Sequence, residues 1–185
     1  MYIFKISVIF YAIMSLTILT WNVRGIISSI LFLSNLLHVT DCDIAIICEH
    51  KPKPSSLSCM NSIDTRYHSV STTDKLNDYF NCTHGKGGIS IMYKSSLQFS
   101  VKEMVDTKSD RIVGIERKSQ NYRSIYIFGV YLPADGLIDN YRQELNALDD
   151  LYSYYINFGN VIVAGNLNVS CINKNLEFSN TMKSK

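Results

Sequence analysis

VIVAGNLNV, residues 161–169, places polar side chains directly after a predicted buried strand. Its first four residues are apolar or small, as is typical of a buried strand. Gly165 then breaks the run, and Asn166 and Asn168 follow two positions apart. Because residues two apart in extended chain point to the same side, these two amides are predicted to share one site at the end of the strand.

Three other polar clusters follow predicted strands in the same way. WNVRG comes after a strand at residues 15–21, CEHK after one at 44–48 and YLPADG after one at 124–132. Residues 44–48, IAIIC, form a short continuous apolar run that is typical of a strand buried on both faces. Since ligand sites in α/β proteins gather at strand ends, these clusters are predicted to line a common site.

The rest of the chain alternates between helical and extended patterns. Apolar spacing predicts helices over residues 26–37 and 137–157, and the second helix has Asp135 or Asp139 to cap its start and Gly159 just after its end. Residues 53–84 are polar and are predicted to be irregular. Further strands are predicted at residues 89–93, 98–104, 112–117 and 161–165. The order of strands and helices predicts a layered α/β fold with mixed sheets.

Composition predicts one folded domain and excludes several classes of protein. The chain has 185 residues, of which 46% are hydrophobic and 18% charged, and its formal net charge is +2. A polybasic nucleic-acid-binding tail is therefore absent, and any contact with nucleic acid depends on local Lys and Arg residues. The five cysteines are odd in number and include no CxxC pair, which argues against a zinc site and a disulfide framework and favours reduced thiols inside the cell, in the nucleus or cytoplasm.

The N-terminal stretch leaves three alternatives open. Residues 1–19 are apolar except for Lys5, Ser7, Ser15 and Thr17. We expect residues 1–13 to be an apolar appendage to a domain that spans residues 14–170 and is followed by a polar tail at 171–185. The alternatives are a secretory signal peptide, or a membrane anchor formed by residues 1–19, although this stretch is short for a span of about 20 residues. Glycosylation at the sequons of Asn81 and Asn168 matters only if the chain is secreted.

Six motifs follow one another along the chain: LTWNVRGI, AIICEHKP, GKGGISIMY, SDRIVGIER, FGVYLPADG and VIVAGNLNV. In this order they resemble the endonuclease/exonuclease/phosphatase superfamily. The residues and the spacing of these motifs are most similar to those of the endonuclease domain of non-LTR (LINE-type) retrotransposons. That domain is related to apurinic/apyrimidinic endonucleases. The resemblance covers residues 15–170 and implies a four-layer α/β sandwich, with two mixed β-sheets flanked by helices. It also implies a hydrolase that cleaves DNA phosphodiesters with Mg²⁺ or Mn²⁺.

The resemblance implies a role for each of five residues. Asn22 and Glu49 match residues that hold the metal, and Tyr131 matches a tyrosine that contacts the scissile phosphate. Asn168 matches an amide that binds phosphate. Asn166 falls where the family has an aspartate that orients or activates the attacking water. Such a set suits the chemistry, because phosphodiester cleavage needs an oriented water, a cation on the charged oxygens and hydrogen-bond donors.

Two departures from the family pattern predict an impaired domain. The amide of Asn166 carries no negative charge and cannot take up a proton at neutral pH. The family's later segment, with a further aspartate and a Ser-Asp-His motif, has no counterpart here, so the fold is expected to be incomplete at the C-terminus and marginally stable. An open strand edge and an exposed part of the core are expected to follow.

Three further residues are open candidates. His50 adjoins Glu49 and is a candidate for substrate contact by position alone. Arg24 and Arg111 are candidates for contacts with the DNA backbone, but solvated surface charge is an equally good interpretation.

Overall fold

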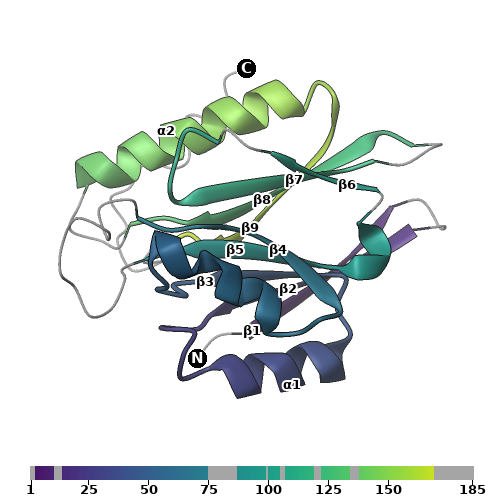
Figure 1. The fold of residues 1–185 in the computed structure, drawn as a ribbon. Coiled ribbons are helices and arrows are strands. Elements are labelled where there is room, and N and C mark those ends of the chain that lie inside the picture. The colour runs from purple at the N-terminus through teal and green to yellow at the C-terminus, as the bar shows by residue number, and fades with distance from the viewer. Residues whose placement is uncertain are drawn as a thin grey trace.

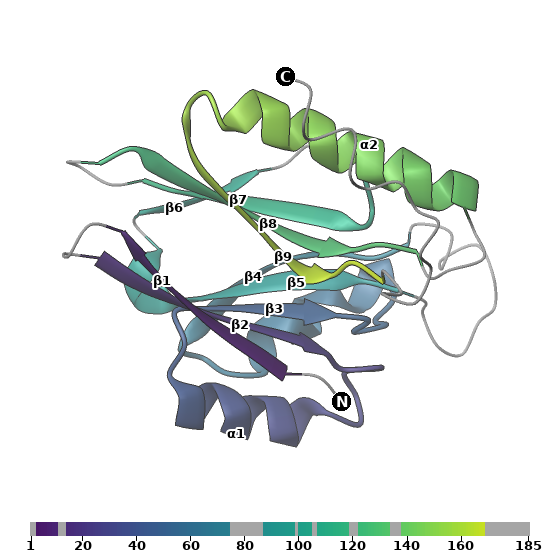
Figure 2. The same ribbon diagram turned by 180° about the vertical axis from the view of Figure 1, so that it is seen from behind.

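Two mixed β-sheets stack face to face in the computed structural model of this protein, and helices cover their outer faces (Figure 1). The structure describes residues 3–10, 14–74, 87–98, 100–104, 107–118, 122–133 and 138–168. The layers run from α2 through the four-stranded sheet and the five-stranded sheet to α1, which confirms the predicted four-layer sandwich. Figure 2 shows the same layers from behind.

The five-stranded sheet has the order β1-β2-β3-β5-β4. Strands β2 and β3 are parallel, and the other neighbours are antiparallel. The helix α1 (Ile30–Thr40) connects β2 to β3, and a 3₁₀ helix, η1 (Pro54–Ser62), precedes β4. The strands are β1 (Ile3–Phe10), β2 (Met14–Asn22), β3 (Ile44–Cys48), β4 (Tyr67–Thr72) and β5 (Ile89–Lys94).

The four-stranded sheet has the order β6-β7-β8-β9. The helix α2 (Ile138–Tyr155) connects β8 to β9, which makes this pair parallel, whereas β6, β7 and β8 pair antiparallel. A short 3₁₀ helix, η3 (Ser95–Leu97), links the two sheets. The strands are β6 (Val101–Met104), β7 (Ile112–Arg117), β8 (Ser124–Tyr131) and β9 (Gly159–Asn166).

Three hydrophobic clusters hold the layers together. The first lies between the sheets and includes Ile46 of β3 and Ile127 of β8. The second joins the five-stranded sheet to α1 through Leu33 and Leu37. The third joins the four-stranded sheet to α2 and includes Leu148. Burial of these apolar side chains is the main favourable contribution to folding.

Helix α1 begins later than the apolar spacing predicts, at Ile30 instead of residue 26. The backbone amides of Gly25 and Ile26 donate to the carbonyl oxygens of Glu49 and His50, both at 2.8 Å. These residues therefore pair with the loop after β3 and do not enter the helix, although the side chain of Ile26 is buried.

The prediction that residues 53–84 are irregular is wrong for η1 and β4. Strand β4 has a polar sequence because it lies at the edge of its sheet, where only Tyr67 is fully buried. The Ser71 hydroxyl lies 2.6 Å from that of Ser90 on β5, which satisfies two polar groups inside the sheet. Residues 75–84 lie outside the described residues.

Gly159 has a different position from the one predicted, because it is the first residue of β9. A Cβ atom at this position would overlap the carbonyl of Ser124, its partner on β8. The helix-capping prediction for Asp135 lies outside the described residues, whereas Asp139 is in the first turn of α2.

The N-terminal residues extend the five-stranded sheet. Residues 3–10 form β1, which pairs with β2 over its whole length, from Ile3 opposite Trp21 to Phe10 opposite Met14. Of the helices among the described residues, neither α1 nor α2 is both long and apolar enough to cross a membrane.

Candidate functional site

The carboxyl ends of four strands meet at one edge of the sandwich. In the parallel pair of β2 and β3, Asn22 is opposite Cys48, and in the parallel pair of β8 and β9, Tyr131 is opposite Asn166. The buried thiol of Cys48 donates to the carbonyl of Val130 at 3.6 Å and so connects the two sheets at this edge. Burial raises the pKa of Cys48 to about 12, so the thiol stays protonated and is not a nucleophile.

Glu49 is held in a left-handed conformation immediately after β3, with φ of 58°. Its amide donates to the carbonyl of Gly88 at 2.8 Å, and its own carbonyl accepts from Gly25 at 2.8 Å. The side chain remains 21% exposed, and its Oε1 lies 3.0 Å from the Nζ of Lys51. The backbone is thus fixed by the loops on both sides, while the carboxylate faces a position that solvent can reach.

Tyr131 is half-buried at the end of β8, between Glu49 and Arg111. Burial raises the pKa of its hydroxyl, and the negative charge of Glu49 raises it further. The guanidinium of Arg111 lies 5.7 Å from the centre of the ring, and its Nη1 donates to the Tyr131 carbonyl at 3.4 Å. A protonated hydroxyl in this place is a hydrogen-bond donor for an anionic oxygen.

Asn166 and Asn168 form a closed turn at the end of β9. The Oδ1 of Asn166 accepts from the backbone amide of Asn168 at 3.0 Å, and Asn168 is left-handed, with φ of 48°. The Nδ2 of Asn168 donates to the carbonyl of Leu132 at 2.6 Å. The turn needs an acceptor at Asn166, and an aspartate would supply the same one.

Asn22 shapes the loop after β2 in a similar way. Its Oδ1 accepts from the amide of Arg24 at 3.1 Å, and Arg24 is left-handed, with φ of 51°. The five residues that the resemblance singles out therefore lie at the ends of neighbouring strands, at one edge of the molecule.

His50 lies inside the protein and does not face this edge. Its side chain is fully buried, neither ring nitrogen has a hydrogen-bond partner among the described residues, and the ring fills the space that a Cβ atom of Gly88 would need. Burial lowers the pKa of His50 to about 4. The ring is neutral at physiological pH and has no route to a substrate.

The chemical types at the edge fit a divalent cation such as Mg²⁺. Glu49 offers carboxylate oxygen, and Asn22 offers an amide oxygen, which accepts from the Arg24 amide and has one lone pair still free. One carboxylate is enough for Mg²⁺ when water and phosphate supply the other ligands. Within the part of the chain that the structure describes, no group of three or more His, Cys, Asp or Glu residues could hold a metal.

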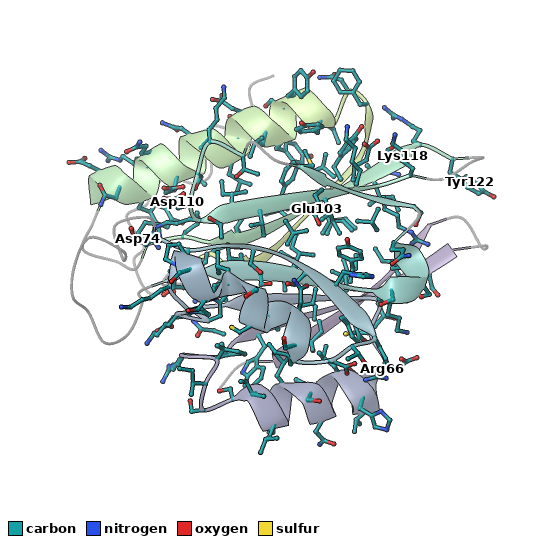
Figure 3. The ribbon with its side chains drawn as sticks, in the orientation of Figure 1. Arg66, Asp74, Glu103, Asp110, Lys118 and Tyr122 are labelled. Atoms are coloured by element: carbon teal, nitrogen blue, oxygen red, sulfur yellow. The ribbon has the colours of Figure 1, made fainter. Side chains whose placement is uncertain are left out.

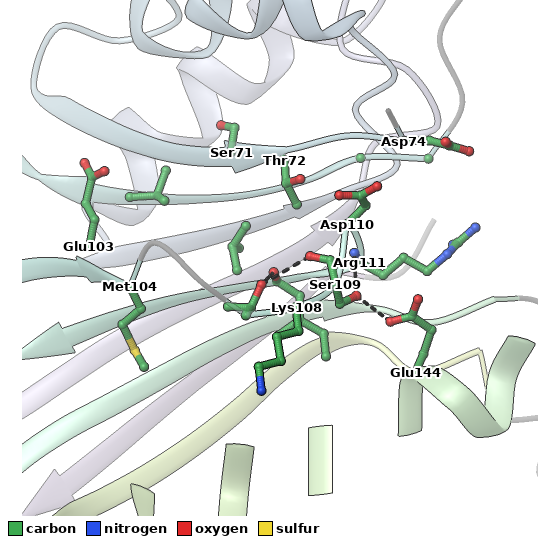
Figure 4. Close-up of a pocket in the computed structure, with 16 residues that line it drawn as sticks. Ser71, Thr72, Asp74, Glu103, Met104, Lys108, Ser109, Asp110, Arg111 and Glu144 are labelled. Carbon is green, nitrogen blue, oxygen red and sulfur yellow. Dashed lines mark hydrogen bonds between the residues drawn. The ribbon is translucent and has the colours of Figure 1, made fainter. Parts of the chain in front are cut away.

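A polar cavity of about 670 Å³ adjoins this edge between β4 and β7 (Figure 4). It shares Gly87, Gly88 and Arg111 with the surroundings of Tyr131 and Glu49. Asp74 and Asp110 line the cavity and lie together at this end of the molecule, whereas Lys118 and Tyr122 lie at the opposite end (Figure 3). Glu144 of α2 accepts a hydrogen bond from Ser109 at the cavity wall.

Sequence reasoning assigned no role in the site to Lys51 or to the glycine pair Gly87-Gly88, although both lie in the quoted motifs. Both glycines have positive φ, 64° and 91°, and their carbonyls accept the amides of Lys51 and Glu49. The signal for Gly87-Gly88 is the doubled glycine before a strand, which indicates close backbone approach. A lysine two residues after the glutamate gives no comparable signal, since charged residues commonly flank strands.

Comparison with solved structures identifies several proteins that share this fold. The catalytic domain of APE2 from Xenopus laevis matches with a TM-score of 0.65 at 20% identity, over 83% of this chain and 58% of that one. The 3′ phosphatase NExo from Neisseria, bound to a product DNA hairpin, matches with a TM-score of 0.61 at 20% identity, over 82% and 57%. An AP endonuclease from Archaeoglobus fulgidus gives a TM-score of 0.57 at 21% identity, over 83% and 58%.

The chain thus spans a little more than half the length of these enzymes. At the level of sequence, no family description and no curated protein matches it. At such low identities the likeness shows the shared fold alone.

Proposed function

We propose that this chain is a metal-dependent phosphodiester hydrolase domain of the retroelement DNA endonuclease type, similar to apurinic/apyrimidinic endonucleases, with its hydrolytic step impaired. The observation that carries the proposal is the common edge of Asn22, Glu49, Tyr131, Asn166 and Asn168. The LINE-type assignment is supported by the residues and the order of the six sequence motifs. DNA as the partner is supported by the solved NExo structure with product DNA.

Each residue has a role that its surroundings permit. Glu49 and Asn22 would hold Mg²⁺ or Mn²⁺, which when bound supplies positive charge to the phosphate oxygens. The protonated hydroxyl of Tyr131 donates to a non-bridging phosphate oxygen. The second N–H of the Asn168 amide binds the same phosphate, because the first is engaged with Leu132.

The attacking water lacks a base. Asn166 accepts a hydrogen bond and so can orient a water molecule, but it cannot remove the proton. The loss of a positioned general base typically lowers the rate by about 10² to 10⁴, or roughly 3 to 5 kcal/mol of activation free energy.

Restoring the acid tests the proposal. We predict that Asn166→Asp raises the rate of nicking of supercoiled DNA in Mg²⁺ by about 10² to 10⁴, because it adds the base without changing the turn. Glu49→Gln in the Asn166→Asp background should abolish the gain. Nicking is measured on intact and on abasic DNA, because this comparison distinguishes a retroelement-type endonuclease from an apurinic/apyrimidinic endonuclease.

Asn160→Asp is the matched control, since Asn160 is an exposed residue at the opposite end of β9. It introduces the same charge in the same strand and should leave nicking unchanged. Equal nicking by the unmodified chain and by Asn166→Asp would show that the unmodified site is not impaired. A lack of activity in both would contradict the hydrolase assignment.

A second function is favoured by the neutral amide itself. A chain with Asn166 keeps the phosphate-binding groups Tyr131 and Asn168 but not the base, and would then be a non-catalytic module that binds nucleic acid. DNA binding measured by fluorescence anisotropy, together with no nicking by either variant, identifies this outcome.

The three cysteines that the structure describes, Cys42, Cys48 and Cys59, are free thiols. These thiols support our proposal that the protein works in a reducing compartment, the nucleus or cytoplasm.

A further inference from the structure

Lys51 provides a positive charge at the position where Glu49 would hold a metal. Its Nζ lies 3.0 Å from Glu49 Oε1, and the two side chains are 36% and 21% exposed. The partners are two residues apart, and both have a left-handed backbone, with φ of 63° and 58°.

The loop backbone holds this ion pair in place. The amide of Lys51 donates to the carbonyl of Gly87 at 3.0 Å, and the amide of Glu49 donates to Gly88. The Lys51 stem packs beside Gly25. A Cβ atom added to Gly25 would lie 3.9 Å from the Cδ of Lys51. An exposed ion pair usually contributes little because two long side chains must be ordered. Here the fixed backbone removes part of that entropic loss.

Charge balance gives the pair its significance. Among the five residues of the proposed site, Glu49 alone carries a negative charge, and Lys51 neutralises it. A divalent cation that binds Glu49 must therefore displace the ammonium or accept it as a positive neighbour.

Lys51 also lies close to the phosphate-binding side of the site. The Lys51 amide donates a hydrogen bond to the carbonyl of Gly87. A Cβ atom added to Gly87 would lie 3.8 Å from the ring of Tyr131. The loop that carries Lys51 therefore packs next to the residue that adjoins Tyr131.

We propose that Lys51 is a tethered counter-ion that competes with the divalent cation for Glu49 and, once displaced, binds the phosphodiester. The metal and the substrate are then coupled through one side chain: the cation frees Lys51, and Lys51 strengthens the binding of DNA. This inference rests on the proposed function, because it takes Glu49 as the metal ligand.

The test measures binding of Mn²⁺ to the full chain by electron paramagnetic resonance, without DNA. Lys51→Met should lower the dissociation constant for Mn²⁺ about three- to tenfold, and Lys51→Arg should not, because it keeps the charge. Lys53→Met is the matched control, as it removes the same charge two residues further along and should leave the constant unchanged. Glu49→Gln should abolish the binding.

The second arm measures DNA binding by anisotropy. Mn²⁺ should raise the affinity of the unmodified chain for DNA more than that of Lys51→Met. The proposal is overturned if Lys51→Met and Lys53→Met bind Mn²⁺ equally, or if Glu49→Gln leaves Mn²⁺ binding intact. Both arms are independent of hydrolysis. A lack of nicking by both the unmodified chain and Asn166→Asp would therefore contradict the hydrolase proposal and leave the exchange at Glu49 standing.

Discussion

His50 is a buried polar residue whose ring nitrogens lack partners among the described residues. The imidazole ring lies where a Cβ atom of residue 88 would be. The backbone of Gly88 also has a φ of 91°, at which any other residue would be strained. Burying polar groups without hydrogen bonds lowers stability. His50 and Gly88 therefore form a packing unit. The imidazole ring occupies the volume that a side chain at position 88 would need, and Gly88 leaves that volume free.

This unit predicts a pH dependence of stability. The pKa of His50 is lowered from 6.5 to about 4 in the folded protein. The unfolded chain therefore binds more protons between these values, so the free energy of unfolding should fall as pH drops from about 6.5 to about 4, by up to roughly 3 kcal/mol.

Urea unfolding of the chain at pH 7 and pH 5 measures the effect. His50→Leu removes the titrating group and fills the same apolar surroundings, so the difference in unfolding free energy between the two pH values should shrink. An equal difference in both proteins would show that other groups cause the acid sensitivity.

Elements with a strong apolar pattern could be predicted from the sequence, and the polar edge strand β4 could not. Strands β3 and β7 were predicted with their observed ends, because a continuous or alternating apolar run stops at a polar cluster. β4 was missed, since an edge strand with one buried residue has no such run. The start of α1 was misplaced because the amides of Gly25 and Ile26 bond to another loop, a long-range contact that local spacing does not contain.

Helix α1 predicts a contrast between two leucines. Leu33 is fully buried against the five-stranded sheet, whereas Leu31 is 86% exposed. Leu33→Ala should lower the free energy of unfolding by about 2 to 5 kcal/mol because it leaves a cavity, and Leu31→Ala should change it by less than about 0.5 kcal/mol.

Denaturant unfolding of the two variants tests the contrast. Since both are the same substitution in one helix, helix propensity contributes equally to the two values. Similar losses of stability would mean that the outer face of α1 is covered in solution.

At the scale of the whole molecule, the proposed site depends on the spacing of the two sheets. Asn22 and Glu49 come from one sheet, and Tyr131, Asn166 and Asn168 come from the other. The sequence predicted these residues through motifs and their order, but not Lys51 or the burial of His50. Both of those depend on how the loop after β3 folds against Gly87 and Gly88.

Gly129 sets the spacing between the sheets. A Cβ atom there would lie 3.1 Å from Ile91 and 3.2 Å from Ile46, both on the opposite sheet. We predict that Gly129→Val lowers the free energy of unfolding by about 1 to 3 kcal/mol through overpacking. Because the sheets must separate to admit the side chain, Mn²⁺ binding at Glu49 should be weakened less than DNA binding, which uses both sheets.

Thermal melting and the two binding measurements check this prediction. Asn160→Val, on the exposed part of β9, is the control for adding a branched side chain to the same sheet. Unchanged DNA binding in Gly129→Val would show that the site tolerates a change in sheet spacing.

The turn at Asn166 has a consequence for the chemical ageing of the protein. Hydrolysis of that one side-chain amide, with loss of ammonia, produces aspartate and leaves the acceptor of the turn in place. If the acid form is about 10² to 10⁴ times faster, a deamidated fraction of about one molecule in a hundred would account for about half to nearly all of the activity in a preparation. Turnover would then increase with storage time and follow the deamidated fraction seen by mass spectrometry.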